Sequence, residues 1–209
     1  MNLDEIDVVS WDVDGTLYSL PLMSSAVLGL FMARLCSKNA LSACREVVLL
    51  HQIRRTMRRI RAAEGSMSSH RLQPELQQRL LIEKRWYGQA IKRIGLRGGV
   101  LDVIMRFKNA GLRQIIVSDY VSDYKLEMLG LDNIFDGMYA GEILGFVKPS
   151  PRLFTMVAKD QGVSANRILH IGDNEARDGR AAREAGCRVA ILGNDFCTFR
   201  HFLATIESP

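Results

Sequence analysis

The sequence predicts an α/β protein in which a parallel sheet with helices on both faces is interrupted by an all-helical insertion. Short apolar runs rich in β-branched residues alternate with helical stretches toward the two ends of the chain, an order typical of parallel sheets. Between them, residues 19–97 show helical periodicity. With 209 residues, 47% hydrophobic and 24% charged, the chain is long and apolar enough to bury one such core, which excludes a disordered protein.

The core is expected to comprise two segments, residues 1–18 and 98–209. Its first strand is the run Ile6–Val13, IDVVSWDV, which ends abruptly at a tight loop, Asp14-Gly15-Thr16. Later strands are predicted over Gln114–Ser118, Arg167–Ile171 and Val189–Leu192. Helices are predicted over Val100–Asn109, Ser122–Leu129, Pro151–Gln161 and the residues leading to Ala185. A glycine follows shortly after each of the first three helices, where a left-handed residue commonly ends a helix.

The insertion, residues 19–97, is expected to form helices. We predict an amphipathic helix around Ser25–Cys36. A second helix follows from the helical spacing of four apolar residues, Leu50, Ile53, Met57 and Ile60. After a loop at Gly65–Ser69, Pro74 suits the first turn of a third helix, whose packing Trp86 and Tyr87 would anchor.

The position of the insertion in the chain predicts where it lies. It leaves after the first strand and returns before the second, so it would stand over the carboxyl ends of the strands as a lid. The two crossings, near Tyr18–Pro21 and at Gly98-Gly99, are the expected hinges for lid motion. Ligands of parallel sheets bind at the same carboxyl ends.

Charge is unevenly distributed along the chain. Residues 19–97 carry 15 Lys and Arg against 4 Asp and Glu, a net charge of +11, whereas the remaining residues carry −6. Five arginines crowd one predicted helix: Arg54, Arg55, Arg58, Arg59 and Arg61. They form either a lid that attracts an anionic substrate or partner, or a solvated helix face. Nucleic acid is a disfavoured partner, because aromatic residues near this patch are few and no nucleic-acid signature is present.

The remaining composition indicates a cytoplasmic protein. The four cysteines lack C-x-x-C spacing and are expected to be reduced, mostly buried thiols: Cys36, Cys44, Cys187 and Cys197. The acidic beginning, MNLDEID, lacks the features of a signal peptide. The most apolar stretch, Leu17–Cys36, contains Pro21, Arg34 and several hydroxyl residues, so no membrane span is expected. The oligomeric state is left open between monomer and homodimer.

Two aspartates, Asp12 and Asp14, flank one residue at the end of the first predicted strand. Alternation along a strand places both side chains on the same side. Two neighbouring carboxylates raise each other's pKa unless a cation lies between them, and a set of oxygen ligands favours Mg²⁺. Gly15 permits close approach of the backbone to a ligand. The alternative is that Asp-x-Asp-Gly serves only as a turn.

Further polar groups follow the other predicted strands. Ser118 ends one strand, Lys148 lies in a loop that enters a helix, and Asp173 and Asp178 belong to the segment GDNEARD after a third strand. A nucleophilic carboxylate, a neighbouring acid, metal ligands, a hydroxyl and a lysine are the groups that phosphoryl transfer needs, because metal and lysine neutralise the phosphate oxygens.

Taken in chain order, DVDGT, IIVSD, KPSPRLF and GDNEARD resemble the motifs of the haloacid dehalogenase (HAD) superfamily of aspartate-nucleophile hydrolases. The chain is similar to the branch whose cap is inserted between the first and second motifs. The resemblance covers the core nearly end to end, while the insertion resembles the family's cap in its position but not recognisably in its sequence. It implies a Rossmann-like parallel sheet with an inserted all-helical cap domain at residues 19–97.

The resemblance implies a role for each motif residue. Asp12 would be the nucleophile that forms an aspartyl-phosphate, and Asp14 the general acid and then the base. Ser118 would bond a phosphoryl oxygen, and Lys148 would hold the phosphate. The residues expected beside the substrate are Gly15, Thr16, Ser118, Asp119 and Lys148. The Mg²⁺ ligands would be Asp12, the backbone carbonyl of Asp14, and Asp173, with Asp178 in support.

The expected function is a Mg²⁺-dependent phosphatase for a small phosphorylated metabolite. Family dehalogenases lack an aspartate at the position of Asp14, so the resemblance favours phosphate chemistry over carbon–halogen cleavage. Asp119 departs from the asparagine that often follows the motif serine, and its carboxylate would repel a phosphate unless it turns away or is neutralised. A phosphomutase with the same residues, and a protein that binds a polyanion or acidic partner through the basic cap, are the alternatives.

Overall fold

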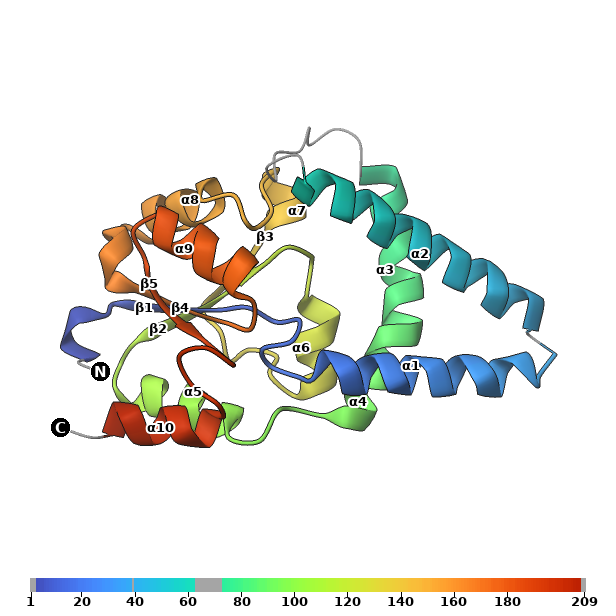
Figure 1. The fold of residues 1–209 in the computed structure, drawn as a ribbon, viewed down its shortest axis with the longest axis horizontal. Coiled ribbons are helices and arrows are strands. Elements are labelled where there is room, and N and C mark those ends of the chain that lie inside the picture. Colours follow the sequence, from blue (N-terminus) through green and yellow to red (C-terminus); the bar gives the residue numbers. More distant parts are fainter. Residues whose placement is uncertain (1–2, 39, 63–72, 208–209) are drawn as a thin grey trace.

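The computed structural model describes residues 3–38, 40–62 and 73–207 and has an α/β architecture (Figure 1). A 3-10 turn, Leu3–Glu5, leads into strand β1, Val8–Trp11. Over the described residues, β1 is followed by α1 (Leu20–Leu35), α2 (Ala40–Ala62), α3 (Gln73–Glu83), the π-helical segment η3 (Lys84–Gly88) and α4 (Gln89–Ile94), which precede α5 (Val100–Asn109) and the next strand. Strands and helices then alternate through the rest of the chain.

This later part supplies four more strands and most of their covering helices. The strands are β2 (Arg113–Ser118), β3 (Gly137–Ala140), β4 (Ile168–Gly172) and β5 (Arg188–Ile191). The helices are α5 (Val100–Asn109), α6 (Asp123–Leu129), α7 (Gly141–Leu144), α8 (Arg152–Gln161), α9 (Arg180–Glu184) and α10 (Phe199–Glu207). Two short segments complete it, the 3-10 turn η4 (Ala165–Arg167) and the π-helical η5 (Glu175–Gly179).

All five strands are parallel and lie in the order β3-β2-β1-β4-β5, so β1 is central. Trp11 pairs with Ile116 of β2 on one side and with Ile171 of β4 on the other. The carboxyl ends of β1, β2 and β4 therefore meet at one edge of the sheet. This is the edge where the sequence predicts the polar groups.

Helices cover both faces of the sheet, as expected (Figure 1). On one face, the Trp11 ring lies 6.2 Å from Phe107 of α5 and 6.1 Å from Phe199 of α10. The other face is covered by α8 and α9, where Phe154 and Ala181 are buried with Val8 and Ile115. In α5, the buried residues recur at the spacing that places them on one side of a helix: Val100, Val103, Ile104 and Phe107.

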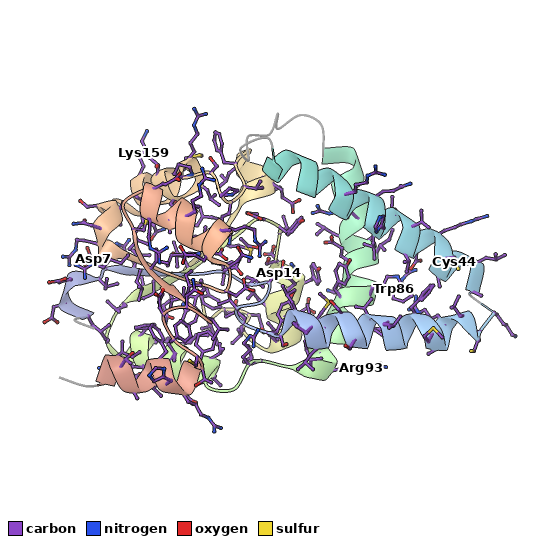
Figure 2. All side chains as sticks on the ribbon, in the orientation of Figure 1. Asp7, Asp14, Cys44, Trp86, Arg93 and Lys159 are labelled. Carbon is purple, nitrogen blue, oxygen red and sulfur yellow. The ribbon has the colours of Figure 1, made fainter. Side chains whose placement is uncertain are left out.

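The helical elements α1, α2 and η3 pack on one another through Trp86, as predicted for this residue (Figure 2). Trp86 is fully buried, and its indole N–H donates to Glu46 Oε2 at 2.7 Å. The Arg34 guanidinium lies 4.6 Å from the indole ring. Thus α1, α2 and η3 are joined by one side chain. That residues 19–97 form a domain of their own stays a prediction.

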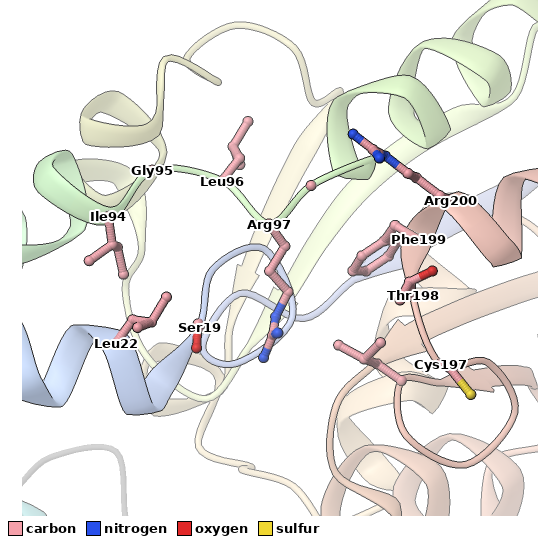
Figure 3. A pocket seen from close by; sticks show the side chains of 12 residues that line it. Ser19, Leu22, Ile94, Gly95, Leu96, Arg97, Cys197, Thr198, Phe199 and Arg200 are labelled. Atoms are coloured by element: carbon pink, nitrogen blue, oxygen red, sulfur yellow. The ribbon is translucent and has the colours of Figure 1, made fainter.

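The two crossings between these helices and the sheet region lie at one pocket of about 470 Å³ (Figure 3). Ser19 and Leu22 line it from the first crossing, and Ile94–Gly98 line it from the second. Arg97 donates from Nε to the carbonyl of Gly15 at 2.8 Å. The second crossing is therefore bonded directly to the loop that follows β1.

The predicted strands are all present, but β3 and α10 were not predicted. The helix at α1 begins earlier than expected, and it is not amphipathic: Met23 and Leu30 are buried, while Leu28 and Met32 on other sides are exposed. The expectation of mostly buried cysteines is wrong, because three of the four are exposed and only Cys187 is buried. The predicted loop at Gly65–Ser69 lies outside the described residues.

Candidate active site

The predicted site residues converge at the carboxyl edge of the sheet. Asp12 follows β1 and is held there by its backbone N–H, which donates to Ile171 of β4 at 2.9 Å. Lys148 reaches the same point from the loop between α7 and α8. Its buried ammonium lies 2.5 Å from Oδ1 of Asp12 and 2.5 Å from Oδ1 of Asp178. One lysine thus joins the end of β1 to the segment after β4.

Asp12 is buried and has hydrogen-bond donors on both oxygens. Lys148 bonds Oδ1, and the hydroxyl of Thr16 donates to Oδ2 at 3.0 Å. Burial raises the pKa of Asp12 most strongly; Lys148 opposes this rise, and the carboxylates of Asp178 and Asp173 add to it, giving a pKa of about 7. A further cation beside Asp12 would favour its ionised form. Thr16, expected beside the substrate, holds the candidate nucleophile in place.

Three carboxylates gather close enough to bind one metal ion. Asp12, Asp173 and Asp178 each offer an oxygen, and these three atoms lie within 4.8 Å of one another. Oδ1 of Asp173 is buried and has no hydrogen-bond partner. Because Mg²⁺ prefers carboxylate oxygens, this set fits the ion that the sequence predicts. The Asp14 side chain does not join this cluster.

Gly15 shapes the cluster by lacking a side chain. Its φ is +101°, and a methyl group at its Cα would lie only 2.0 Å from Oδ2 of Asp173. Asp173 therefore occupies the space that any other residue at position 15 would fill. This close approach is the structural reason for glycine in the DVDGT motif.

Besides Lys148, two groups hold Asp178 in place. The backbone N–H of Asn174 donates to its Oδ2 at 3.1 Å, while Nε2 of the buried His170 lies 3.5 Å from its Oδ1. Burial would raise the pKa of Asp178, but Lys148 and His170 outweigh that effect and lower it. The other ring nitrogen of His170 lies 3.0 Å from Ser10 Oγ. From its place inside a strand, His170 is predicted only to pack in the core; its contact with Asp178 depends on the turn after β4, which shows no sequence signal.

Asp14 points to a different set of partners. The ammonium of Lys125 lies 2.8 Å from its Oδ1 and 2.6 Å from its Oδ2, and the hydroxyl of Tyr18 also donates to Oδ1. Burial would raise the pKa of Asp14, but Lys125 and Tyr18 outweigh it and lower the pKa. Lys125 was not predicted, because a lysine in a short helix is ordinarily exposed; here it is buried.

Ser118 and Asp119 are both buried at the end of β2. The Ser118 hydroxyl oxygen accepts from the backbone N–H of Tyr120 and from Ser122 Oγ, each at 3.3 Å. Asp119 turns its carboxylate to the loop that carries Lys148: Oδ1 accepts the backbone N–H of Lys148 at 2.8 Å, and Oδ2 lies 4.0 Å from the Arg177 guanidinium. Its charge is thus engaged by donors of the protein.

Of the arginine group in the insertion, Arg55 is exposed on α2. The side chains of Arg54, Arg58, Arg59 and Arg61 lie outside what the structure describes. Over the described residues, every helix is too short or too polar to cross a membrane.

Comparisons with known proteins agree with this geometry. A family model described as haloacid dehalogenase-like hydrolase matches residues 6–186. Phosphoserine phosphatase from Thermus thermophilus is 34% identical over 85 residues, which cover 39% of this chain and 34% of that protein. The matched segments span less than half of the length of the curated relatives, between 27% and 46%.

Solved structures match over nearly the whole chain. The HAD-hydrolase YfnB from Bacillus subtilis, bound to magnesium, has a TM-score of 0.69 at 20% identity, over 97% of this chain and 99% of that one. A 2-haloacid dehalogenase from Pseudomonas syringae has a TM-score of 0.66 at 17% identity, over 96% and 98%. At these identities the likeness concerns the fold alone.

Proposed function

The chain belongs to the haloacid dehalogenase-like hydrolase family, and on that premise we propose that it is a Mg²⁺-dependent phosphatase of a small phosphomonoester. The observation that carries the proposal is the pair Asp12 and Asp14, two residues apart, each paired with its own buried lysine. An aspartate at position 14 supplies the proton donor that an alcohol leaving group needs and that a halide does not. It therefore favours a phosphatase over a dehalogenase.

In the first step, a carboxylate oxygen of Asp12 attacks phosphorus while the bond from phosphorus to the ester oxygen breaks. Protonated Asp14 gives its proton to that oxygen, so the alcohol leaves neutral. Thr16 and Lys148 orient the attacking carboxylate through its two oxygens. The product is an aspartyl-phosphate on Asp12 and an ionised Asp14.

In the second step, ionised Asp14 takes a proton from water, whose oxygen attacks phosphorus. The bond between phosphorus and Asp12 breaks, phosphate leaves, and Asp14 is again protonated. The ion pair with Lys125 favours the ionised Asp14 that this step uses. The first step needs the opposite form, so substrate binding has to loosen the ion pair.

Mg²⁺ would be held by Asp12, Asp173 and Asp178, and when bound it would neutralise the phosphate oxygens. Lys148 supplies a second positive charge at the same place. Ser118, at the end of β2, would donate its hydroxyl to a phosphoryl oxygen. Residues 19–97 would act as the cap over a core of residues 1–18 and 98–209.

The test is phosphate release from a panel of small phosphomonoesters, with Mg²⁺ or with EDTA, for the wild type and Asp12→Asn. The matched control is Asp132→Asn, at an exposed loop aspartate. We expect release that needs Mg²⁺, is abolished in Asp12→Asn and is unchanged in Asp132→Asn. Transfer of phosphate to a second hydroxyl without free phosphate would contradict hydrolysis and indicate a phosphomutase.

A further inference from the structure

A second buried polar cluster lies between α3 and the sheet region, beside Asp14. It consists of Arg79 and Glu83 from α3, Tyr124 and Lys125 from α6, and Glu142 from α7, and all five are buried. Nη2 of Arg79 lies 2.6 Å from Oε1 of Glu142, and its Nε lies 3.8 Å from Glu83. We call these five residues the Arg79–Glu142 cluster. It brings together residues that are up to 63 positions apart in the chain.

The cluster is continuous with the candidate general acid. Its Lys125 is the residue whose ammonium bonds both oxygens of Asp14. The same ammonium lies 5.9 Å from the ring centre of Tyr124 and 5.5 Å from that of Tyr120. The Arg79 guanidinium lies 5.6 Å from the Tyr120 ring. Since Asp14 would protonate the ester oxygen, the cluster lies where the leaving group would extend.

The cluster holds most of the unpartnered buried atoms in the described part of the chain. Four buried side-chain polar atoms there have no hydrogen-bond partner, and one of them is Oδ1 of Asp173, in the group of three carboxylates that could bind a metal ion. The other three are Nε of Arg79, the hydroxyl of Tyr124 and Oε2 of Glu142. Buried polar atoms are normally paired, because leaving them unpaired destabilises the fold. The polar groups of a bound molecule would satisfy these three atoms together, since Glu83, the charged neighbour of Nε of Arg79, lies 3.8 Å away.

The charges of the cluster specify what that molecule carries. Arg79 is paired with Glu142 and lies near Glu83, and Lys125 is paired with Asp14. Each positive charge of the cluster is thus paired with a carboxylate. A second phosphate or a carboxylate on the substrate would be repelled by Glu83 and Glu142. The unpartnered atoms are one donor, one acceptor and one hydroxyl. Hydroxyl groups both donate and accept, so they complement this set.

We propose that the Arg79–Glu142 cluster binds the leaving group, and that this group is neutral and polyhydroxylated. The substrate is then the monophosphate of a sugar or polyol without a second anionic group. The inference rests on the proposed phosphatase function. Burial raises the pKa of Tyr124 well above its ordinary value, so its hydroxyl keeps the proton that it would donate.

The test is Tyr124→Phe, which removes only the unpartnered hydroxyl. The matched control is Tyr139→Phe, whose hydroxyl bonds Asp160 and Gln161 away from the site. Substrates are glucose 6-phosphate, ribose 5-phosphate and glycerol 3-phosphate as hydroxylated members, 2-phosphoglycolate as a carboxylated member, and p-nitrophenyl phosphate, whose leaving group lacks the additional hydroxyls.

We expect the wild type to prefer a hydroxylated member over 2-phosphoglycolate. In Tyr124→Phe, kcat/KM for that member should fall about tenfold, the effect of one lost hydrogen bond, while p-nitrophenyl phosphate hydrolysis stays within about twofold. The melting temperature should not fall, because the hydroxyl has no partner to lose. Tyr139→Phe should change neither activity. A wild-type preference for 2-phosphoglycolate would overturn the inference. So would an unchanged kcat/KM for the hydroxylated substrate in Tyr124→Phe.

Binding measurements distinguish failure of this inference from failure of the proposed phosphatase function. Calorimetry with the Asp12→Asn protein measures affinity for the same panel without turnover. If the wild type hydrolyses nothing but the Asp12→Asn protein binds a sugar monophosphate, and adding Tyr124→Phe weakens binding about tenfold, the subsite stands and hydrolysis fails. If the Asp12→Asn protein binds no hydroxylated member, the subsite fails whatever the wild type hydrolyses.

Discussion

Replacing Gly15 with alanine should weaken metal binding by the three carboxylates Asp12, Asp173 and Asp178 and leave the fold in place. A methyl group at Gly15 would lie 2.0 Å from Oδ2 of Asp173, whereas ordinary contact begins near 3.4 Å, so the carboxylate has to move by about 1.4 Å. Displacing a catalytic group by about 1 Å costs on the order of 100-fold in rate. We expect Gly15→Ala to lose about 100-fold in Mg²⁺-dependent phosphate release and to need more Mg²⁺ for half-maximal activity.

The matched control is Gly162→Ala, which introduces the same kind of backbone strain without a clash and so distinguishes the two effects. Gly162 also has a positive φ, +66°, but nothing lies within 4 Å of a methyl group there. A side chain in the left-handed region costs roughly 1–2 kcal/mol, so both variants should lose stability in urea denaturation. Only Gly15→Ala should lose Mg²⁺ affinity in calorimetry. Wild-type Mg²⁺ affinity in Gly15→Ala, or an equal loss of affinity in Gly162→Ala, would contradict this prediction.

Three further predictions concern the groups around the two aspartates. Lys125→Met should lower the free energy of unfolding by about 3 kcal/mol in urea denaturation, because it leaves Asp14 without its cation. As the control, Lys84→Met at an exposed ion pair should change it by less than about 1 kcal/mol. Thr16→Val should reduce kcat about tenfold through loss of the bond to Asp12, with little change in KM. In EDTA, the stability of the wild type relative to Asp12→Asn should fall as the pH rises from about 4 to about 7, measured by calorimetric melting; a flat or rising difference contradicts the assignment. Stability falls with rising pH because folding raises the pKa of Asp12. The stabilisation from protonated Asp12 is fully present below the pKa of the unfolded state and is lost as the pH rises through about 7.

The sequence predicted the sheet well because its central strands are short apolar runs that end in polar groups. The run before Asp12 and the run before Ser118 both form strands at the predicted places. Strand β3 was missed because its four residues, Gly137–Ala140, include a glycine and are mostly half-buried at the sheet edge. Edge strands lack the continuous apolar pattern on which the prediction depends.

The candidate site was predictable only where its residues lie in motifs. Asp12, Lys148, Asp173 and Asp178 stand in short motif segments, and the structure brings them together, whereas Asp14 pairs with Lys125. Lys125 and Arg79 have no such signal, because each is one basic residue within a helix. What gives them importance is burial beside a carboxylate from a distant element, and that depends on how α3 and α6 pack. Tertiary packing therefore decides the groups beyond the motifs.

Asp12 and Asp14 have pKa shifts opposite to those that the proposed reaction needs. The proposed nucleophile, Asp12, has to be ionised, yet burial raises its pKa. The proposed acid, Asp14, has to be protonated, yet Lys125 lowers its pKa. A divalent cation beside Asp12, Asp173 and Asp178 would reverse the first shift, since a nearby positive charge favours the carboxylate. A leaving group that enters between Asp14 and the Arg79–Glu142 cluster would reverse the second by drawing Lys125 away. Cation and substrate would thus each prepare one aspartate, and hydrolysis would begin only when both are bound.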